Sequence, residues 1–134
     1  MAKFILWFAS LVFIGYGFAC LIDPNIPTAY IGYEMTRADA VIETRAMYGG
    51  LELGFGLFCL LAVFQIRFQE AGLISIVLVV GGLAVGRTIG LLFTTEPATI
   101  YSWGAVVLES FMTLTAFVTL NKEKYNLPDP HAAI

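Results

Sequence analysis

Residues 43–58 read Glu43-Thr-Arg-Ala-Met-Tyr-Gly-Gly-Leu-Glu-Leu-Gly-Phe-Gly-Leu-Phe58, and in them two acids, an arginine and four glycines interrupt an apolar run. On a helix, side chains three, four or seven positions apart share a face. One face of this segment carries polar side chains, those of Arg45, Tyr48 and Glu52. A neighbouring face carries one acid and two small residues, Glu43, Gly50 and Gly54. The segment predicts a helix with a polar flank beside a flank suited to close helix packing.

The composition of the whole chain indicates that this helix lies in a membrane. Of the 134 residues, 59% are hydrophobic and only 13% are charged, whereas about a quarter of the residues of a soluble domain are charged. The net charge of -3 comes without a basic cluster, which excludes nucleic acid as a partner. Two cysteines, Cys20 and Cys59, lie in apolar runs without metal-ligand spacing, and this favours buried packing thiols. The lipid bilayer is the expected surrounding.

Four apolar runs are long enough to cross a bilayer. The predicted spans are residues 4–22, 44–66, 71–93 and 98–120, and residues 121–134 form a tail that Pro128 and Pro130 keep from being helical. The first run could also be a signal peptide, but Phe18 stands where a lipoprotein cleavage box needs a small residue. We therefore predict an all-α polytopic membrane four-helix bundle, with residues 1–134 as a single domain.

The second helix is expected to exceed the membrane thickness. It should begin near Arg37, with Thr36 and Asp39 as a capping pair, and continue to about Phe68. The surplus length predicts a tilt, a projecting outer end, or a kink near residues 49–50.

The third span contains glycines at four-residue spacing, Gly82, Gly86 and Gly90. Such a face permits close approach of another helix. It can serve packing inside the bundle or association with another chain, and the sequence leaves both open.

The distribution of basic residues predicts the orientation. Four of them fall on the side of both termini and the middle loop, namely Lys3, Arg67, Lys122 and Lys124, and two on the opposite side, Arg37 and Arg45. Basic residues are enriched in cytoplasmic loops. Both termini are therefore expected in the cytoplasm, with residues 23–37 and 94–97 outside.

Charges in the spans should have partners from other helices, because one charge at membrane depth costs about 2.5–3.5 kcal/mol on insertion scales. Two further charges lie in later spans, Arg87 and Glu109. A guanidinium offers five donors in a planar fork. We therefore expect a cluster of Glu52, Arg87 and Glu109, with Tyr48 as a further donor.

The depths of the three charges agree with such a cluster. From the helical rise, Arg87 lies about 10 Å, Glu52 about 12 Å and Glu109 about 16 Å below the outer boundary. Arg45 and Glu43 are expected to pair nearer the outer surface. Two acids around one arginine leave a negative charge, which a proton on one carboxyl, Arg45, water or a cationic ligand would balance.

The pattern Glu43-Thr-Arg-Ala-Met-Tyr-Gly-Gly-Leu51, the later Gly82-Leu-Ala-Val-Gly-Arg87 and Glu109 in the last span resemble a family of small bacterial four-helix membrane proteins. That family is catalogued as domain of unknown function 4345. The resemblance covers helices two to four well and implies a four-span protein of the inner membrane. A weaker likeness to DoxX-like four-helix proteins implies no activity.

Three classes of function agree with these features. The first, which the sequence favours, is a non-catalytic subunit or assembly partner of an inner-membrane complex, either a homo-oligomer or a partner of other membrane subunits. The second is binding or transport of a small molecule or lipid through an outward-facing polar pocket lined by Tyr48, Glu52, Arg87 and Glu109. The third is an intramembrane enzyme with a carboxylic acid as proton donor.

Several chemistries are not expected. The chain has one histidine, His131, in the proline-bounded tail, which excludes a histidine-ligated haem or di-iron site within one chain. No P-loop, nucleotide fingerprint or serine nucleophile elbow occurs. We therefore predict no cofactor, no metal and no catalytic residue.

Overall fold

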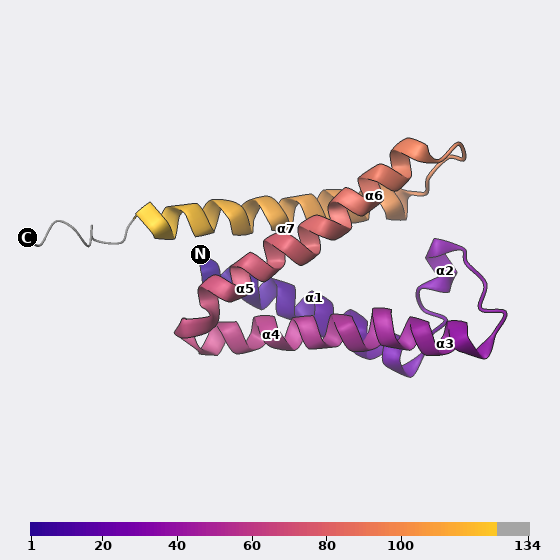
Figure 1. Ribbon diagram of the computed structural model, residues 1–134, viewed down its shortest axis with the longest axis horizontal. Helices are drawn as coiled ribbons and strands as arrows, with labels where there is room; N and C mark the ends of the chain where they lie inside the picture. The colour runs from indigo at the N-terminus through magenta and orange to yellow at the C-terminus, as the bar shows by residue number, and fades with distance from the viewer. Residues whose placement is uncertain (126–134) are drawn as a thin grey trace, which may run out of the picture. The chain divides into compact units, whose positions relative to one another are not determined.

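The computed structural model of the protein is all-α, which confirms the predicted fold class (Figure 1). It describes the backbone of residues 1–125 and the side chains up to residue 122, so Pro128, Pro130 and His131 lie outside the described residues. Four helical stretches are long and apolar enough to cross a membrane: Ala2–Ile22, Ala38–Phe64, Ile66–Phe93 and Ile100–Lys122. The protein is a membrane protein. Its chain forms two compact units, residues 6–68 and residues 1–5 with 69–134, and that residues 1–134 act as a single domain stays a prediction.

In the unit of residues 6–68, α1 (Ala2–Ile22) packs against α4 (Glu52–Phe64). The two backbones meet at glycines. A Cβ atom on Gly17 would lie 2.5 Å from the Leu53 nitrogen, and one on Gly56 would lie 2.6 Å from the Ile14 nitrogen. The rings of Phe13 and Phe55 also join the two helices edge to face, with centroids 4.7 Å apart and planes at 89°.

The chain between α1 and the next long helix is fixed by local contacts. Asp23 accepts hydrogen bonds from the backbone and side-chain nitrogens of Asn25, and these bonds hold the pKa of the Asp23 carboxyl below its ordinary value. Pro27 then precedes the short α2 (Thr28–Ile31), which ends at Gly32 with a left-handed φ of 82°. α1 thus ends at Ile22, shortly before Pro24 and Pro27, which cannot continue a regular helix.

The second long helix consists of α3 (Ala38–Thr44), the π-helical segment η1 (Arg45–Leu51) and α4. The Nε atom of Arg45 donates to the Leu21 carbonyl, so Arg45 lies level with the last turn of α1. Residues 38–44 of the second long helix therefore project beyond α1. Whether a tilt, a projecting outer end or a kink accommodates the surplus length in a membrane stays a prediction.

The expected capping pair is not formed. The N-cap of α3 is Arg37 and it makes no side-chain capping bond. The Asp39 carboxylate instead binds the exposed Arg37 guanidinium at 3.0 Å. A Thr36 cap would start the helix at Arg37, but α3 starts at Ala38, so Asp39 lies in the first turn beside Arg37.

The second long helix ends at Phe64, before the 3₁₀ turn η2 (Ile66–Phe68), in which the Arg67 guanidinium stacks on the Phe68 ring.

The other unit contains α5 (Gln69–Ser75), the π-helical segment η3 (Ile76–Val80) and α6 (Gly81–Phe93), which form one continuous helix antiparallel to α7 (Ile100–Tyr125). All three segments contact α7. Their buried residues recur at helical spacing, namely Leu73, Ile76, Val80 and Ala84 on one side and Glu109, Met112, Ala116 and Thr119 on the other. This packing determines which side chains of α6 and α7 meet.

Candidate functional site

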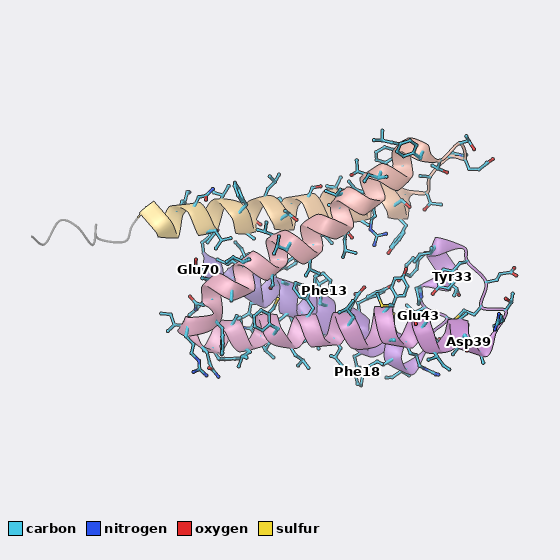
Figure 2. All side chains as sticks on the ribbon, viewed as in Figure 1. Phe13, Phe18, Tyr33, Asp39, Glu43 and Glu70 are labelled. Atoms are coloured by element: carbon cyan, nitrogen blue, oxygen red, sulfur yellow. The ribbon has the colours of Figure 1, made fainter. Side chains whose placement is uncertain are left out.

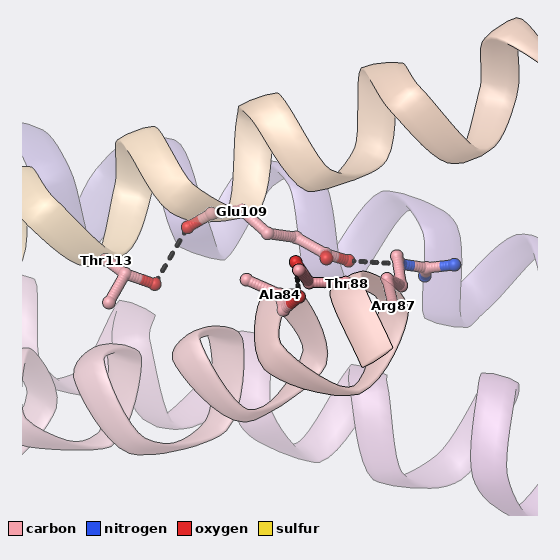
Figure 3. A network of polar contacts seen from close by, with 5 residues as sticks. All are labelled: Ala84, Arg87, Thr88, Glu109 and Thr113. Atoms are coloured by element: carbon pink, nitrogen blue, oxygen red, sulfur yellow. Dashed lines mark hydrogen bonds and ion pairs between the residues drawn. The ribbon is translucent and has the colours of Figure 1, made fainter. Parts of the chain in front are cut away.

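The charged pair in the second unit is formed by Arg87 and Glu109 (Figure 3). The Arg87 Nε atom donates to Glu109 Oε1 at 2.8 Å. The side chain of Glu109 is 11% exposed and that of Arg87 is 29% exposed. The predicted contact between these two residues is therefore present, and it links α6 to α7 across the helix interface.

Helix packing and backbone bonds position this pair. Gly81 brings α6 close to α7, since a Cβ atom there would lie 3.1 Å from the Thr113 Cγ2 atom. The Thr113 hydroxyl donates to the Glu109 carbonyl, and the Thr88 hydroxyl donates to the Ala84 carbonyl. These hydroxyls are satisfied within their own helices, as polar groups in a membrane must be.

Two further features complete the surroundings of the pair. The Arg87 guanidinium lies 5.7 Å from the centroid of the Tyr101 ring, within the range of a cation–π contact. The second carboxylate oxygen of Glu109, Oε2, is buried without a hydrogen-bond partner among the described residues. The Glu109 carboxylate thus uses one oxygen to hold α6 and keeps the other shielded from solvent.

The predicted pairing of Arg45 with Glu43 is wrong within the described residues. The Arg45 Nε atom donates to the Leu21 carbonyl at 3.2 Å. The C-terminal end of α1 carries partial negative charge, which favours a cation there. Glu43 is exposed and lies with Asp39 and Tyr33 at the α3 end of this unit (Figure 2). Residues two positions apart on a helix point to nearly opposite sides, so they do not meet.

Glu52 and Tyr48 belong to the first unit, and both are half-buried. Glu52 is the first residue of α4. On the neighbouring α1, the Tyr16 hydroxyl accepts a hydrogen bond from the Tyr30 hydroxyl. Of the predicted Glu52–Arg87–Glu109 cluster, the contact between Arg87 and Glu109 is present. The place of Glu52 in the cluster stays a prediction.

The glycines expected at helix contacts differ from those that make contacts. Within their own units, an added Cβ atom would meet no atom within 4 Å at Gly54, Gly82, Gly86 and Gly90. At Gly50 it would meet only the Arg45 carbonyl of the same helix, at 3.8 Å. The contact glycines are Gly17, Gly49, Gly56 and Gly81 instead. That Gly82, Gly86 and Gly90 form a face for another chain stays a prediction.

Sequence reasoning missed several residues of these sites. Tyr101 is placed beside Arg87 by the turn between α6 and α7, and no sequence spacing predicts that contact. One feature of the sequence could have indicated Tyr16 and Cys20 on α1. They lie one residue before and three residues after Gly17, a small residue at which helices can cross.

The arrangement in α6 and α7 can be compared with known proteins. A family model described as Domain of unknown function (DUF4345) matches residues 1–120. The chain belongs to this family. No curated protein and no solved structure matches it.

The DUF4345 match extends over all four span-forming helices, including α1. In the described side chains of this DUF4345 protein, no group of three or more His, Cys, Asp or Glu residues could hold a metal ion.

Proposed function

We propose that this DUF4345 protein is a non-catalytic subunit or assembly partner of an inner-membrane complex, with both termini in the cytoplasm. The observation that carries the proposal is the Arg87–Glu109 ion pair, which joins α6 to α7 at 2.8 Å. A buried ion pair is well suited to fix the register of two helices. An acid that acts on a substrate must be reachable, whereas the Glu109 side chain is largely buried.

The contacts of Arg45 support the same proposal. Its Nε atom bonds the last turn of α1, so this arginine of the Glu43–Leu51 motif also holds one helix end against another. In each unit, an arginine of a span thus contributes to the contact of a helix pair. Such a scaffold presents its outer faces to other membrane segments.

We place the helix of another subunit on the α6 face formed by Gly82, Gly86 and Gly90. These glycines are exposed and lie on the side of α6 opposite its contact with α7. Four-residue spacing of small residues allows a second backbone to approach closely. The partner is expected to be a transmembrane helix, supplied by a second copy of this chain or by a different chain.

The proposal is tested by purifying the protein from native membranes in a mild maltoside and determining the mass and composition of the complex. We expect a stoichiometric protein subunit, and mass spectrometry identifies it as a second copy or a different chain. A monomer that carries no other subunit would contradict the proposal. A retained small molecule in such a monomer would favour a binding function.

The contact face is tested by Gly86→Leu, which should lower the mass of the complex because the added side chain blocks backbone approach. The matched control is Gly104→Leu on α7, where an added Cβ atom also meets nothing within 4 Å, and it should leave the mass unchanged. An unchanged mass for a folded Gly86→Leu variant would exclude this face as the subunit contact.

A further inference from the structure

The segment that joins α1 to α3 is attached to both helices by tyrosine hydroxyls. The Tyr30 hydroxyl of α2 donates to the Tyr16 hydroxyl of α1. The Tyr33 hydroxyl shares a hydrogen bond of 3.0 Å with the Thr44 hydroxyl of α3. All four residues belong to the unit of residues 6–68. We call residues 33–37, which follow α2 and lead into α3, the strap.

The strap folds back on the helix that it leads into. α3 starts at Ala38, yet Tyr33 bonds the last residue of α3, Thr44. Thr44 is only 5% exposed, and it comes directly before the π-helical segment η1. The strap therefore lies over the junction between α3 and η1.

Gly32 separates the strap from α2. Its φ of 82° lies in the left-handed region, which glycine adopts without strain. On the α2 side, the Gly32 nitrogen donates to the Thr28 carbonyl. On the other side, no backbone hydrogen bond in the described part of the chain involves residues 33–36. Gly32 is thus a point at which the strap can turn while α2 keeps its place on α1.

Side-chain contacts have to hold the strap, and they are few. None of its side chains is buried, and only those of Tyr33 and Met35 are half-buried. The ion pair of Arg37 with Asp39 is exposed and contributes little. Segments with few buried contacts open locally at a fraction of the free energy of global unfolding. The hydrogen bond between Tyr33 and Thr44 is therefore the contact on which closure of the strap depends.

Both hydroxyls of this hydrogen bond have other partners when the strap is open. The Thr44 hydroxyl can donate to the carbonyl four residues earlier in its own helix, as the Thr88 hydroxyl does to the Ala84 carbonyl. The Tyr33 hydroxyl can bond water. The closed strap is thus favoured by the small net contribution of one hydrogen bond, and a small change can open it.

We propose that residues 33–37 open and close over the junction of α3 and η1, with Gly32 as the hinge and the hydrogen bond between Tyr33 and Thr44 as the latch. Opening withdraws Tyr33 from Thr44, while the bond between the Tyr30 and Tyr16 hydroxyls keeps α2 on α1. The device goes beyond the proposed subunit role, because the face assigned to a partner lies on α6 in the other unit.

The test is limited digestion of the purified protein with trypsin in maltoside micelles, followed by mass spectrometry. Trypsin cleaves after Arg37, and that bond fits the protease only when the strap and the start of α3 unfold locally. At low trypsin concentration, the cleavage rate follows the population of the open strap. Cleavage after Arg67, in the turn η2, is the reference in the same sample.

Variants identify the latch. Tyr33→Phe, which keeps the ring and removes the hydroxyl, should speed cleavage after Arg37 about three- to tenfold relative to cleavage after Arg67. Thr44→Val should have the same effect. The double variant should lie within about twofold of either single variant, because both changes break one hydrogen bond. The matched control is Thr36→Val, an exposed threonine of the strap itself, and it should leave the rate unchanged.

Two further variants separate the latch and the hinge from general loss of structure. Thr44→Ser keeps the hydroxyl and should digest like the wild type. Gly32→Ala should speed cleavage after Arg37, because only the closed strap requires a left-handed conformation at residue 32. Circular dichroism before digestion confirms that each variant keeps its helices.

Three outcomes would overturn the proposal. The first is an unchanged cleavage rate in Tyr33→Phe and Thr44→Val. The second is a double variant whose rate is the product of the two single effects, since the hydroxyls would then act separately. The third is no cleavage after Arg37 in any variant, since the strap would then not open. The subunit role is judged by its own mass measurement, which none of these outcomes affects.

Discussion

The close approach of α1 and α4 depends on the missing Cβ atoms of the glycines at their contact. At Gly17 and Gly56, the atoms facing the missing side chain belong to backbone, at 2.5 and 2.6 Å. At Gly49 the nearest atoms belong to the Leu21 side chain, at 2.7 Å, and a side chain can rotate away. Backbone cannot move without separating the helices, so these glycines should differ in their tolerance of alanine.

Gly17→Ala and Gly56→Ala should each lower the free energy of unfolding by about 1–3 kcal/mol, because the added methyl group overpacks the helix contact. Gly49→Ala should cost less. Unfolding by sodium dodecyl sulfate in mixed micelles, followed by circular dichroism, measures these differences.

Gly15→Ala and Gly54→Ala are the matched controls on the same two helices, since an added Cβ atom meets nothing within 4 Å at either position. They should be neutral or slightly stabilising, because alanine favours a helix by up to about 1 kcal/mol over glycine. Equal losses at contact and open glycines would contradict the close packing of α1 on α4.

At the scale of helices, the Arg87–Glu109 ion pair lies in a mainly apolar interface between α6 and α7. The Arg87–Glu109 pair is largely buried, whereas the Arg37–Asp39 pair at the start of α3 has side chains 80% and 79% exposed. A buried pair is costly to break from one side, because the remaining charge has no partner. An exposed pair is screened by water and contributes little.

Arg87→Met should therefore lower the free energy of unfolding by about 3 kcal/mol, whereas the double variant Arg87→Met with Glu109→Met should return to within about 1 kcal/mol of the wild type. Arg37→Met, the exposed control, should cost less than about 1 kcal/mol. The same detergent titration measures all three. A double variant as unstable as Arg87→Met alone would show that the pair does not act as a unit.

At the scale of the whole molecule, orientation depends on charges that lie outside the helix contacts. The basic residues predict cytoplasmic termini and a cytoplasmic turn around Arg67, with residues 23–37 and 94–97 outside. The side chains of Ile66, Glu34 and Glu96 are exposed in these connecting segments. They are suitable positions for a labelling test.

Single cysteines at positions 34 and 96, in a background lacking Cys20 and Cys59, should react with a membrane-impermeant maleimide added outside the cell. A cysteine at position 66 should react only after the membrane is opened. Labelling of position 66 from outside would reverse the predicted orientation.

The sequence determined the class of the protein and the main elements. Four apolar runs exceed the length needed to cross a bilayer, and prolines or polar residues separate them, so the number and nature of the helices follow from local chemistry. The cost of a charge in lipid also predicted that Arg87 would contact a carboxylate, and its contact is Glu109. These conclusions depend on composition and spacing, which the sequence displays directly.

Only the tertiary structure decided which faces of the helices meet. Within the two units, the contact glycines are Gly17, Gly49, Gly56 and Gly81, which residue spacing did not single out. The physical reason is that a small residue permits close approach but does not choose the helix that approaches, and the π-helical segments at residues 45–51 and 76–80 also change the angle between the faces before and after them. For the same reason, the contact of Tyr30 with Tyr16 and that of Arg45 with the end of α1 became evident only when the helices were paired.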